Sequence, residues 1–281
     1  MVKSYTPKNL ADALEALKST DEYLPYAGGS DINVQNISGR NLFFIGKLPE
    51  LKRIYEDEKY IHIGSAVTYS EAVKNPLVPE VFKAAIHKVA GPAVRNVGTY
   101  GGNLANGSGK ADSALVALVC NAVLHIQSAS GERFLEEKYF YRGRKDVFLE
   151  KDELITELLI PKSKSLNNYY YDKVSVRTSV AISNISVAAI WNIEDDIIKE
   201  LSVGIGSATD VPIRCYDVEN ALVGKSIYEV DAQREEILSH FVVDLSLPLD
   251  RTSIRYRKQV CYNLLNYLLY EEFTPIDLSD D

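Results

Sequence analysis

Apolar residues at helical spacing stand near the start of the chain. They recur at i, i+3, i+4 and i+7 after Thr6-Pro7, and this spacing predicts one face of a helix. The members are Leu10, Ala13, Leu14 and Leu17. The stretch YLPYAGGSD at 23–31 predicts a strand that runs into a glycine turn, and LFFIG (42–46) and YIHIGS (60–65) predict further strands. The chain therefore opens with a strand–helix–strand unit.

A second unit of helices and strands follows. The segment 79–92 predicts a helix that stops at Gly91-Pro92. Its apolar face consists of Phe82, Ala85, Ile86 and Val89. We expect AVRNVGTYGG (93–102) to be a strand or an extended connector, AVLHIQSASGERFLEE (122–137) to be a hairpin, and DELITELLIP (152–161) to be a strand.

From about residue 170 the pattern changes. The stretch 184–208 predicts two strands joined by an acidic turn at 194–196, and 214–225 predicts a helix. A long amphipathic segment over 251–270 predicts another helix. The polar stretch PKSKSLNN (161–168) has the composition of a linker, so we expect a separate α+β domain after it.

Two glycine-rich turns carry the candidate chemistry. The first, YAGGSD, occupies 26–31, and the second, TYGGNLANGSGKADSA, occupies 99–114. Glycines let the backbone curl so that several N–H groups face one anion, and such concavities suit phosphate oxygens. A lone glycine-rich segment is as often a turn without any ligand. Because each unit holds one turn, the pair favours a pyrophosphate held between them.

Neither common phosphate motif explains these turns. A P-loop needs Ser or Thr after Gly-Lys, but Gly109-Lys110 is followed by Ala111. The dinucleotide pattern G-x-G-x-x-G occurs in neither turn. The ligand therefore has to be identified from other features.

Composition limits the possible partners. The chain has 281 residues, 46% of them apolar, and a net charge of −8, which argues against a nucleic-acid or anionic-membrane surface. No apolar run approaches the roughly 18 residues of a membrane span, and no apolar core of a signal peptide is present. We therefore expect a cytoplasmic protein. Its cysteines, Cys120, Cys215 and Cys261, are too scattered for a disulfide framework or an iron–sulfur ligand set.

The two turns also carry a family resemblance. Ala27–Asp31 match the pattern A-G-G-[TS]-[DE], and Val94–Asp112 match I-R-N-x-[AG]-T-x-G-G-N-[IL]-x-[NT]-[AG]-S-x-x-[AGS]-D closely. With YDKVSVRTSVAIS at 171–183, the chain resembles the FAD-binding (medium) subunits of the molybdenum hydroxylases, the xanthine, nicotinate and carbon monoxide dehydrogenase family. The second turn looks most like bacterial xanthine dehydrogenase FAD subunits, whereas VRTSVAIS looks more like nicotinate dehydrogenase.

The resemblance implies an α+β protein with two domains. The first would be a two-part FAD-binding domain of the vanillyl-alcohol-oxidase (PCMH) type over 1–165, with subdomains of about 1–57 and 58–165. The second would be a small α+β domain over 170–275, similar to the C-terminal domain of CO dehydrogenase flavoproteins. Relatives with covalent flavin use a histidine, but no histidine lies in either turn, so FAD would be bound noncovalently.

The resemblance also implies a set of cofactor-binding residues. The set is Ala27, Gly28, Gly29, Ser30, Asp31, Thr99, Gly101, Gly102, Asn103, Asp112, Ile155 and Lys173. The two turns would line the pyrophosphate, Asp112 would bond ribose or ribityl hydroxyls, and Ile155 and Lys173 would lie near the adenine or the flavin ring. Arg177 matches an arginine near the flavin, but Ala181 stands where many relatives carry Asp. No catalytic residue and no metal ligand is implied.

The implied function is electron transfer within a complex. A molybdenum-cofactor-binding large subunit and a small [2Fe-2S] subunit would supply the other centres, and electrons would leave FAD for NAD or another acceptor. The substrate, such as xanthine or nicotinate, and the oligomeric state stay open. One alternative is a free-standing FAD-dependent oxidase or reductase of the same fold. Another is a nucleotide-binding regulatory module that has kept only the fold.

Overall fold

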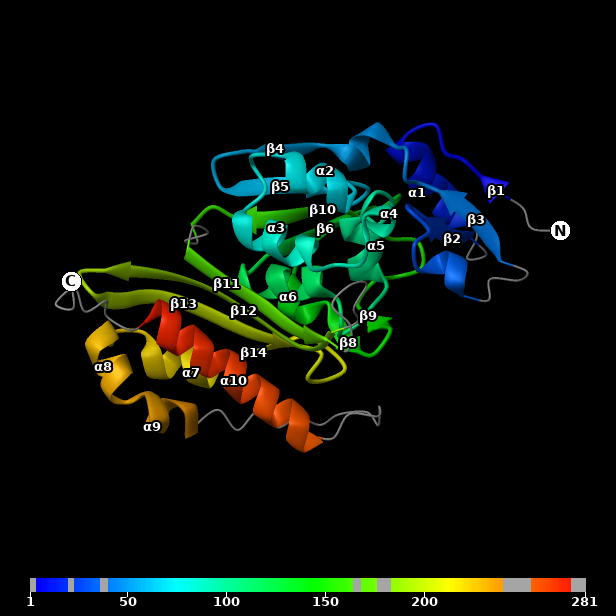
Figure 1. Cartoon of the computed structure of the whole chain (residues 1–281). Coiled ribbons are helices and arrows are strands. Elements are labelled where there is room, and N and C mark those ends of the chain that lie inside the picture. Colours follow the sequence, from blue (N-terminus) through cyan, green and yellow to red (C-terminus); the bar gives the residue numbers. More distant parts are fainter. Residues whose placement is uncertain are drawn as a thin grey trace.

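The described residues form three larger β-sheets, of three, five and four strands, and one two-stranded sheet in the computed structural model (Figure 1). The structure describes residues 4–19, 23–35, 40–163, 168–175, 183–239 and 254–273. Helices and strands are mixed throughout these ranges, which confirms the α+β class. Of the helices in the described ranges, none combines the length and the apolar character needed to cross a membrane.

The first sheet is parallel, with strand order β1-β3-β2. It consists of β1 (Ser4–Tyr5), β2 (Tyr23–Tyr26) and β3 (Asn41–Phe44). Helix α1 (Leu10–Ser19) is the crossover from β1 to β2, the two strands that flank the central β3. The predicted stripe is confirmed, because Ala13, Leu14 and Leu17 are buried in the core of this sheet.

The second sheet is antiparallel, with strand order β4-β5-β10-β6-β7. Its strands are β4 (Ile54–Glu56), β5 (Tyr60–Gly64), β6 (Val123–Ser128), β7 (Gly131–Glu136) and β10 (Leu154–Pro161). The predicted hairpin and the predicted strand after it are confirmed. Short elements between β7 and β10 are the 3₁₀ helix Glu137–Tyr139, β8 (Tyr141–Gly143) and β9 (Asp146–Val147).

Five helices connect β5 to β6, and all of them except α4 add side chains to the hydrophobic core of the second sheet. They are α2 (Tyr69–Lys74), α3 (Glu80–His87), α4 (Pro92–Arg95), α5 (Tyr100–Ala105) and α6 (Asp112–Val119). The expectation of an extended segment over 93–102 is wrong. Pro92 begins a helical turn, and the Thr99 hydroxyl accepts a hydrogen bond from the N–H of Gly102 at 3.2 Å, which caps α5.

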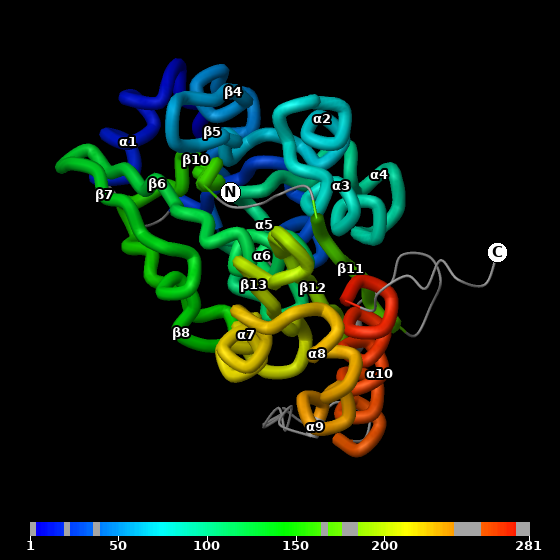
Figure 2. The backbone as a smooth tube through the Cα atoms, turned by 90° about the vertical axis from the view of Figure 1, so that its left-hand side faces the viewer, coloured from blue at the N-terminus to red at the C-terminus, as the bar shows by residue number. Residues whose placement is uncertain are grey.

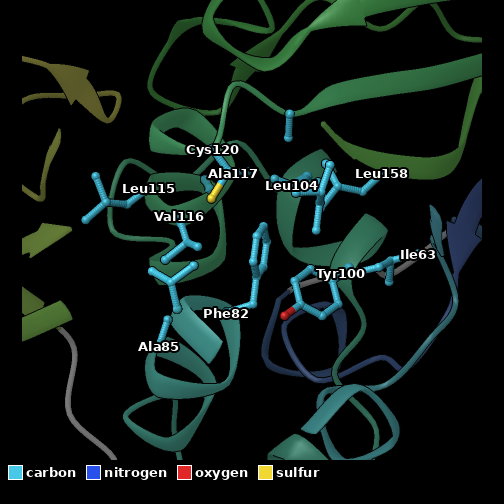
Figure 3. Packing of buried hydrophobic residues seen from close by; sticks show 14 of the residues in the cluster. Ile63, Phe82, Ala85, Tyr100, Leu104, Leu115, Val116, Ala117, Cys120 and Leu158 are labelled. Atoms are coloured by element: carbon cyan, nitrogen blue, oxygen red, sulfur yellow. The ribbon is translucent and has the colours of Figure 1, made fainter. Parts of the chain in front are cut away.

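Helix α6 is the centre of the core. Every one of its residues is buried, and its side chains pack with Phe82 of α3 and Tyr100 of α5 (Figure 3). The same hydrophobic cluster includes Leu158 of the second sheet and Ala188 of the third sheet. An α-helix that is apolar on all sides needs neighbours on all sides, and the two sheets supply them.

The third sheet has strand order β11-β12-β13-β14 and leads into the C-terminal helices. The strands are β11 (Asn168–Ser175), β12 (Ser183–Glu194), β13 (Ile197–Gly206) and β14 (Ile213–Arg214). The helices are α7 (Tyr216–Leu222), α8 (Ile227–Ala232), α9 (Arg234–Ser239) and α10 (Ile254–Glu272). The predicted strand pair, its acidic turn and both predicted helices are confirmed.

The side chains of β12 alternate between the two faces of the third sheet, and both faces are buried in a hydrophobic cluster. Ala188 and Ile190 belong to the cluster around α6, whereas Val187, Ala189 and Trp191 belong to a second cluster with α10. Figure 2 shows α7, α9 and α10 on the side of this sheet away from the first two sheets. Successive side chains of a strand point to opposite faces, so one strand serves two cores.

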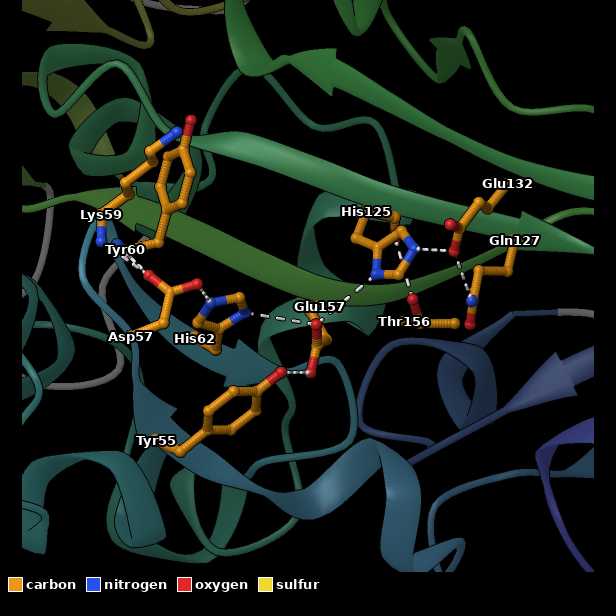
Figure 4. Close-up of polar contacts among 10 residues, drawn as sticks. All are labelled: Tyr55, Asp57, Lys59, Tyr60, His62, His125, Gln127, Glu132, Thr156 and Glu157. Atoms are coloured by element: carbon orange, nitrogen blue, oxygen red, sulfur yellow. Dashed lines mark hydrogen bonds and ion pairs between the residues drawn. The ribbon is translucent and has the colours of Figure 1, made fainter.

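A row of carboxylates and histidines crosses the other face of the second sheet (Figure 4). Oε2 of Glu157 lies 3.3 Å from Nδ1 of His62 and 3.5 Å from Nδ1 of His125. Nε2 of His62 lies 3.0 Å from Asp57, and Nε2 of His125 lies 2.8 Å from Glu132. Acids and bases alternate, so this network joins β4, β5, β10, β6 and β7 through side chains as well as backbone.

The network should make stability depend on pH. The hydrogen bond to Glu157 raises the pKa of His125 above 6.5, so its contribution is present below that value and is lost as the pH rises. Burial acts to raise the pKa of Glu157, but hydrogen bonds from His125, Tyr55 and His62 outweigh it and hold the pKa below 4.5. That contribution is present above 4.5 and is lost as the pH falls.

We predict that Glu157→Gln lowers the free energy of unfolding most between pH 4.5 and pH 6.5, where both Glu157 and His125 are charged. The expected loss is about 1–2 kcal/mol near pH 5.5, because a charged His125 loses its buried carboxylate, and less than about half of that near pH 9. Urea unfolding at both pH values measures it. Glu80→Gln, which removes an exposed ion pair with Lys83, is the matched control and should change stability little at either pH. An equal loss at both pH values for Glu157→Gln would contradict the prediction.

Candidate functional site

The first glycine turn follows β2 and packs against Val97 and Gly98, directly before the second turn. A Cβ on Gly28 would lie 1.6 Å from the carbonyl oxygen of Val97, so only glycine fits there. Gly29 has a φ of +69°, which also favours glycine. A Cβ on Gly98 would lie 3.4 Å from Oγ of Ser30. Two segments far apart in the sequence are therefore in contact, as the pairing of the turns predicts.

The two turns differ in their available N–H groups. In the second turn, the N–H of Gly101 donates to the carbonyl of Ser65 at 2.9 Å, and that of Gly102 donates to the Thr99 hydroxyl. In the first turn, the N–H groups of Gly28 and Gly29 have no acceptor among the described residues. The N–H groups of Gly28 and Gly29 can therefore donate to an anion without losing an existing bond, whereas those of Gly101 and Gly102 cannot.

The two central glycines of the second turn have different surroundings. A Cβ on Gly101 would lie 2.4 Å from Cβ of Ser65, so Gly101 is required by the fold. A Cβ on Gly102 would meet only the Thr99 hydroxyl, at 2.9 Å, and Gly102 is exposed. Gly102 therefore keeps one side of the backbone open to a ligand.

A short hydrogen-bonded series continues from the second turn into the core. Oγ of Ser113 donates to Oδ1 of Asn103 at 2.5 Å, and the hydroxyl of Tyr69 lies 3.3 Å from the same Oγ. Ser113 is the second residue of α6, so this series fixes the Asn103 side chain next to the start of that helix. Neither Ser113 nor Tyr69 was predicted to belong to the site, although Ser113 directly follows the matched motif.

Asp112 and Lys173 form a buried ion pair. Nζ of Lys173 on β11 lies 2.8 Å from Oδ2 of Asp112 at the start of α6, with side chains 5% and 7% exposed. Tyr171, on the same strand as Lys173, is close enough that burial and the Asp112 carboxylate both raise the pKa of its hydroxyl. The structure thus brings together two predicted cofactor residues from different sheets.

Other predicted residues lie apart from this pair or outside the described ranges. The side chain of Ile155 is buried in the hydrophobic core and adds no polar group. Arg177 and Ala181 lie outside the described residues. His62 and His125 are engaged in the network of Figure 4, His87 ends α3, and His240 lies outside the described residues.

The donor set suits a flavin nucleotide. Available N–H groups of the first turn match phosphate oxygens, and a carboxylate such as that of Asp112 accepts hydrogen bonds from ribose or ribityl hydroxyls. The ammonium of Lys173 could face the electron-rich edge of a flavin ring, where positive charge stabilises the reduced form. The chain therefore offers groups that match the phosphates, the hydroxyls and the ring of a flavin nucleotide.

Comparison with known protein families identifies the chain. Residues 1–163 match the family described as the FAD binding domain in molybdopterin dehydrogenase. The chain belongs to this family. Residues 169–271 match the CO dehydrogenase flavoprotein C-terminal domain. The family resemblance and the FAD cofactor are confirmed, and the fold is a two-part FAD-binding domain followed by a C-terminal domain.

Curated relatives and solved structures agree. The putative xanthine dehydrogenase FAD-binding subunit of Escherichia coli (strain K12) is 32% identical over 265 residues, covering 91% of this chain and 89% of the relative. The nicotinate dehydrogenase FAD-subunit of Eubacterium barkeri is 29% identical over 272 residues, covering 91% and 90%. The fold is also that of carbon monoxide dehydrogenase from Hydrogenophaga pseudoflava, with a TM-score of 0.87 at 20% identity over 95% of both chains. The chain is an FAD-dependent oxidoreductase subunit of the molybdenum hydroxylase type.

We predict that Gly102→Val weakens FAD binding about tenfold or more, because its branched side chain would fill the open side of the backbone. Fluorescence titration of the apoprotein with FAD measures the dissociation constant. Gly143→Val is the matched control, since a Cβ at Gly143 has nothing within 4 Å. A folded Gly102→Val variant that binds FAD as tightly as the native chain would exclude Gly102 from the site.

We also predict that Asp112 and Lys173 are energetically coupled. Asp112→Asn removes the carboxylate that lies 2.8 Å from the buried ammonium of Lys173 and should cost about 3 kcal/mol of unfolding free energy. The double variant Asp112→Asn, Lys173→Met removes both charges and should recover part of this loss. Urea unfolding of the native chain, Asp112→Asn, Lys173→Met and the double variant completes a double-mutant cycle. If the losses of the two single variants add up to the loss of the double variant, the pair is not coupled.

Proposed function

We propose that this chain is the electron-transfer flavoprotein subunit of a molybdenum hydroxylase complex that acts on xanthine or a related N-heterocycle. Electrons from a molybdenum centre would cross [2Fe-2S] clusters, reach FAD and leave to NAD or another acceptor. The observation that carries the proposal is the junction of the two glycine turns with the Asp112–Lys173 pair in a chain that aligns over most of its length with FAD subunits. FAD, when bound, would accept and release the electrons.

The residues of the site have separate tasks in this proposal. Gly28 and Gly29 donate N–H groups to the pyrophosphate, and Gly102 lets the cofactor approach the backbone. Asp112 accepts hydrogen bonds from ribose or ribityl hydroxyls. Lys173, fixed by Asp112, favours electron density on the reduced ring. We assign these residues to an FAD-binding domain over 1–165, followed by the second domain over 170–275.

The cysteines support the need for partners. Cys120, Cys215 and Cys261 are free and buried, Cys120 in the cluster around α6 and the other two in the cluster around α10, and burial raises the pKa of the Cys215 and Cys261 thiols to about 12. Iron–sulfur clusters are held by ionised thiolates, about eight of them for two clusters. We therefore assign the [2Fe-2S] clusters to a small subunit and the molybdenum cofactor to a large subunit.

We predict that the isolated, FAD-loaded chain takes electrons from dithionite or NADH but does not hydroxylate xanthine or nicotinate. Flavin bleaching near 450 nm measures reduction, and product formation measures hydroxylation. Adding the molybdenum and iron–sulfur subunits should restore turnover of one of these heterocycles. Hydroxylation by the isolated chain, with molybdenum and iron absent by elemental analysis, would instead favour a free-standing oxidase.

A further inference from the structure

The β8–β9 hairpin lies against the second glycine turn. The backbone N–H of Lys145, in the hairpin turn, donates to the carbonyl of Gly107 at 2.8 Å. Both residues have positive φ, +61° for Lys145 and +63° for Gly107. A Cβ on Gly107 would lie 2.9 Å from Cα of Lys145. This close backbone contact fixes where the Lys145 side chain begins.

The Lys145 side chain joins the two glycine turns. Its ammonium donates a hydrogen bond to Oδ1 of Asn106, in the second turn, and lies 3.7 Å from Oδ2 of Asp31, at the end of the first turn. The side chain is 50% exposed, so the ammonium keeps contact with solvent and room to move. The neighbouring Arg142 is instead paired with Asp146 within the hairpin, at 2.9 Å.

A cation near the two turns would offset the charge of the bound cofactor. The FAD pyrophosphate carries about two negative charges, and Asp31 adds another beside the first turn. The N–H groups of Gly101 and Gly102 are already bonded within the protein, so these two glycines cannot donate to a phosphate without losing a bond. A lysine ammonium is a mobile point charge that binds phosphate well.

We propose that Lys145 is a pyrophosphate-binding residue of the FAD site. Its ammonium, held between Asn106 and Asp31, would bond a phosphate oxygen of FAD and offset part of the pyrophosphate charge. Asp31 then acts as a positioning residue that holds the ammonium at the junction of the turns. The inference rests on FAD as the ligand of this domain.

The test compares three variants by fluorescence titration of the apoprotein with FAD. Lys145→Gln should raise the dissociation constant about tenfold, whereas Lys145→Arg should keep it within about threefold, because it retains the charge. Arg144→Gln is the matched control, since it removes the same charge from the adjacent exposed position and should leave the dissociation constant nearly unchanged. The Lys145→Gln variant should also show weaker salt dependence of FAD binding than the native chain.

The other possible results of these titrations show which of the two proposals is wrong. An unchanged dissociation constant for Lys145→Gln overturns the inference while FAD binding itself stands. Equal weakening by Lys145→Gln and Lys145→Arg, with native salt dependence, shows that Lys145 only shapes the turns, and this also overturns it. A native chain that binds no FAD would instead defeat the function proposed above.

Discussion

The burial of α6 between two sheets is the constraint on which the rest of this structure depends. All residues of the helix are buried, and two glycines of β13 allow the close approach: a Cβ on Gly204 would lie 2.8 Å from Val119, and one on Gly206 would lie 3.2 Å from Leu115. Because α6 starts at Asp112, this packing brings a residue of the FAD-binding domain against Lys173 of the third sheet. The C-terminal domain therefore contributes to the core and supplies one residue of the proposed site.

The same junction holds the second glycine turn from two directions. Ser207, at the end of β13, donates its N–H to the carbonyl of Gly109 at 2.9 Å, and a Cβ on Gly109 would lie 2.4 Å from the carbonyl of Asp210. On the other side, Gly107 packs against Lys145. A turn fixed in this way loses little conformational freedom when a ligand binds, which favours affinity.

Charge is organised differently on the two sides of the second sheet. On the side of α6, the ion pair of Asp112 and Lys173 is almost fully buried, where low dielectric strengthens it but desolvation makes each single charge costly. On the other side lies the hydrogen-bonded network of His62, Glu157 and His125, which ends at two exposed carboxylates, those of Asp57 and Glu132. The histidines of this face are thus hydrogen-bonded to carboxylates of the sheet and of the turn after β4.

The sequence alone determined the local elements and the motif. Apolar spacing is set by backbone geometry, so the α1 and α3 stripes, the β6–β7 hairpin and the strands on either side of 195–196 were predictable, and the two glycine motifs indicated the family. The extended segment expected over 93–102 instead forms α4 and α5, with Pro92 and Thr99 at their starts. Only the tertiary structure decided that Asp112 meets Lys173 and that Lys145 joins the two turns. These two contacts depend on segments far apart in the sequence, which are brought together by the packing of α6 between two sheets and of the hairpin against the second turn.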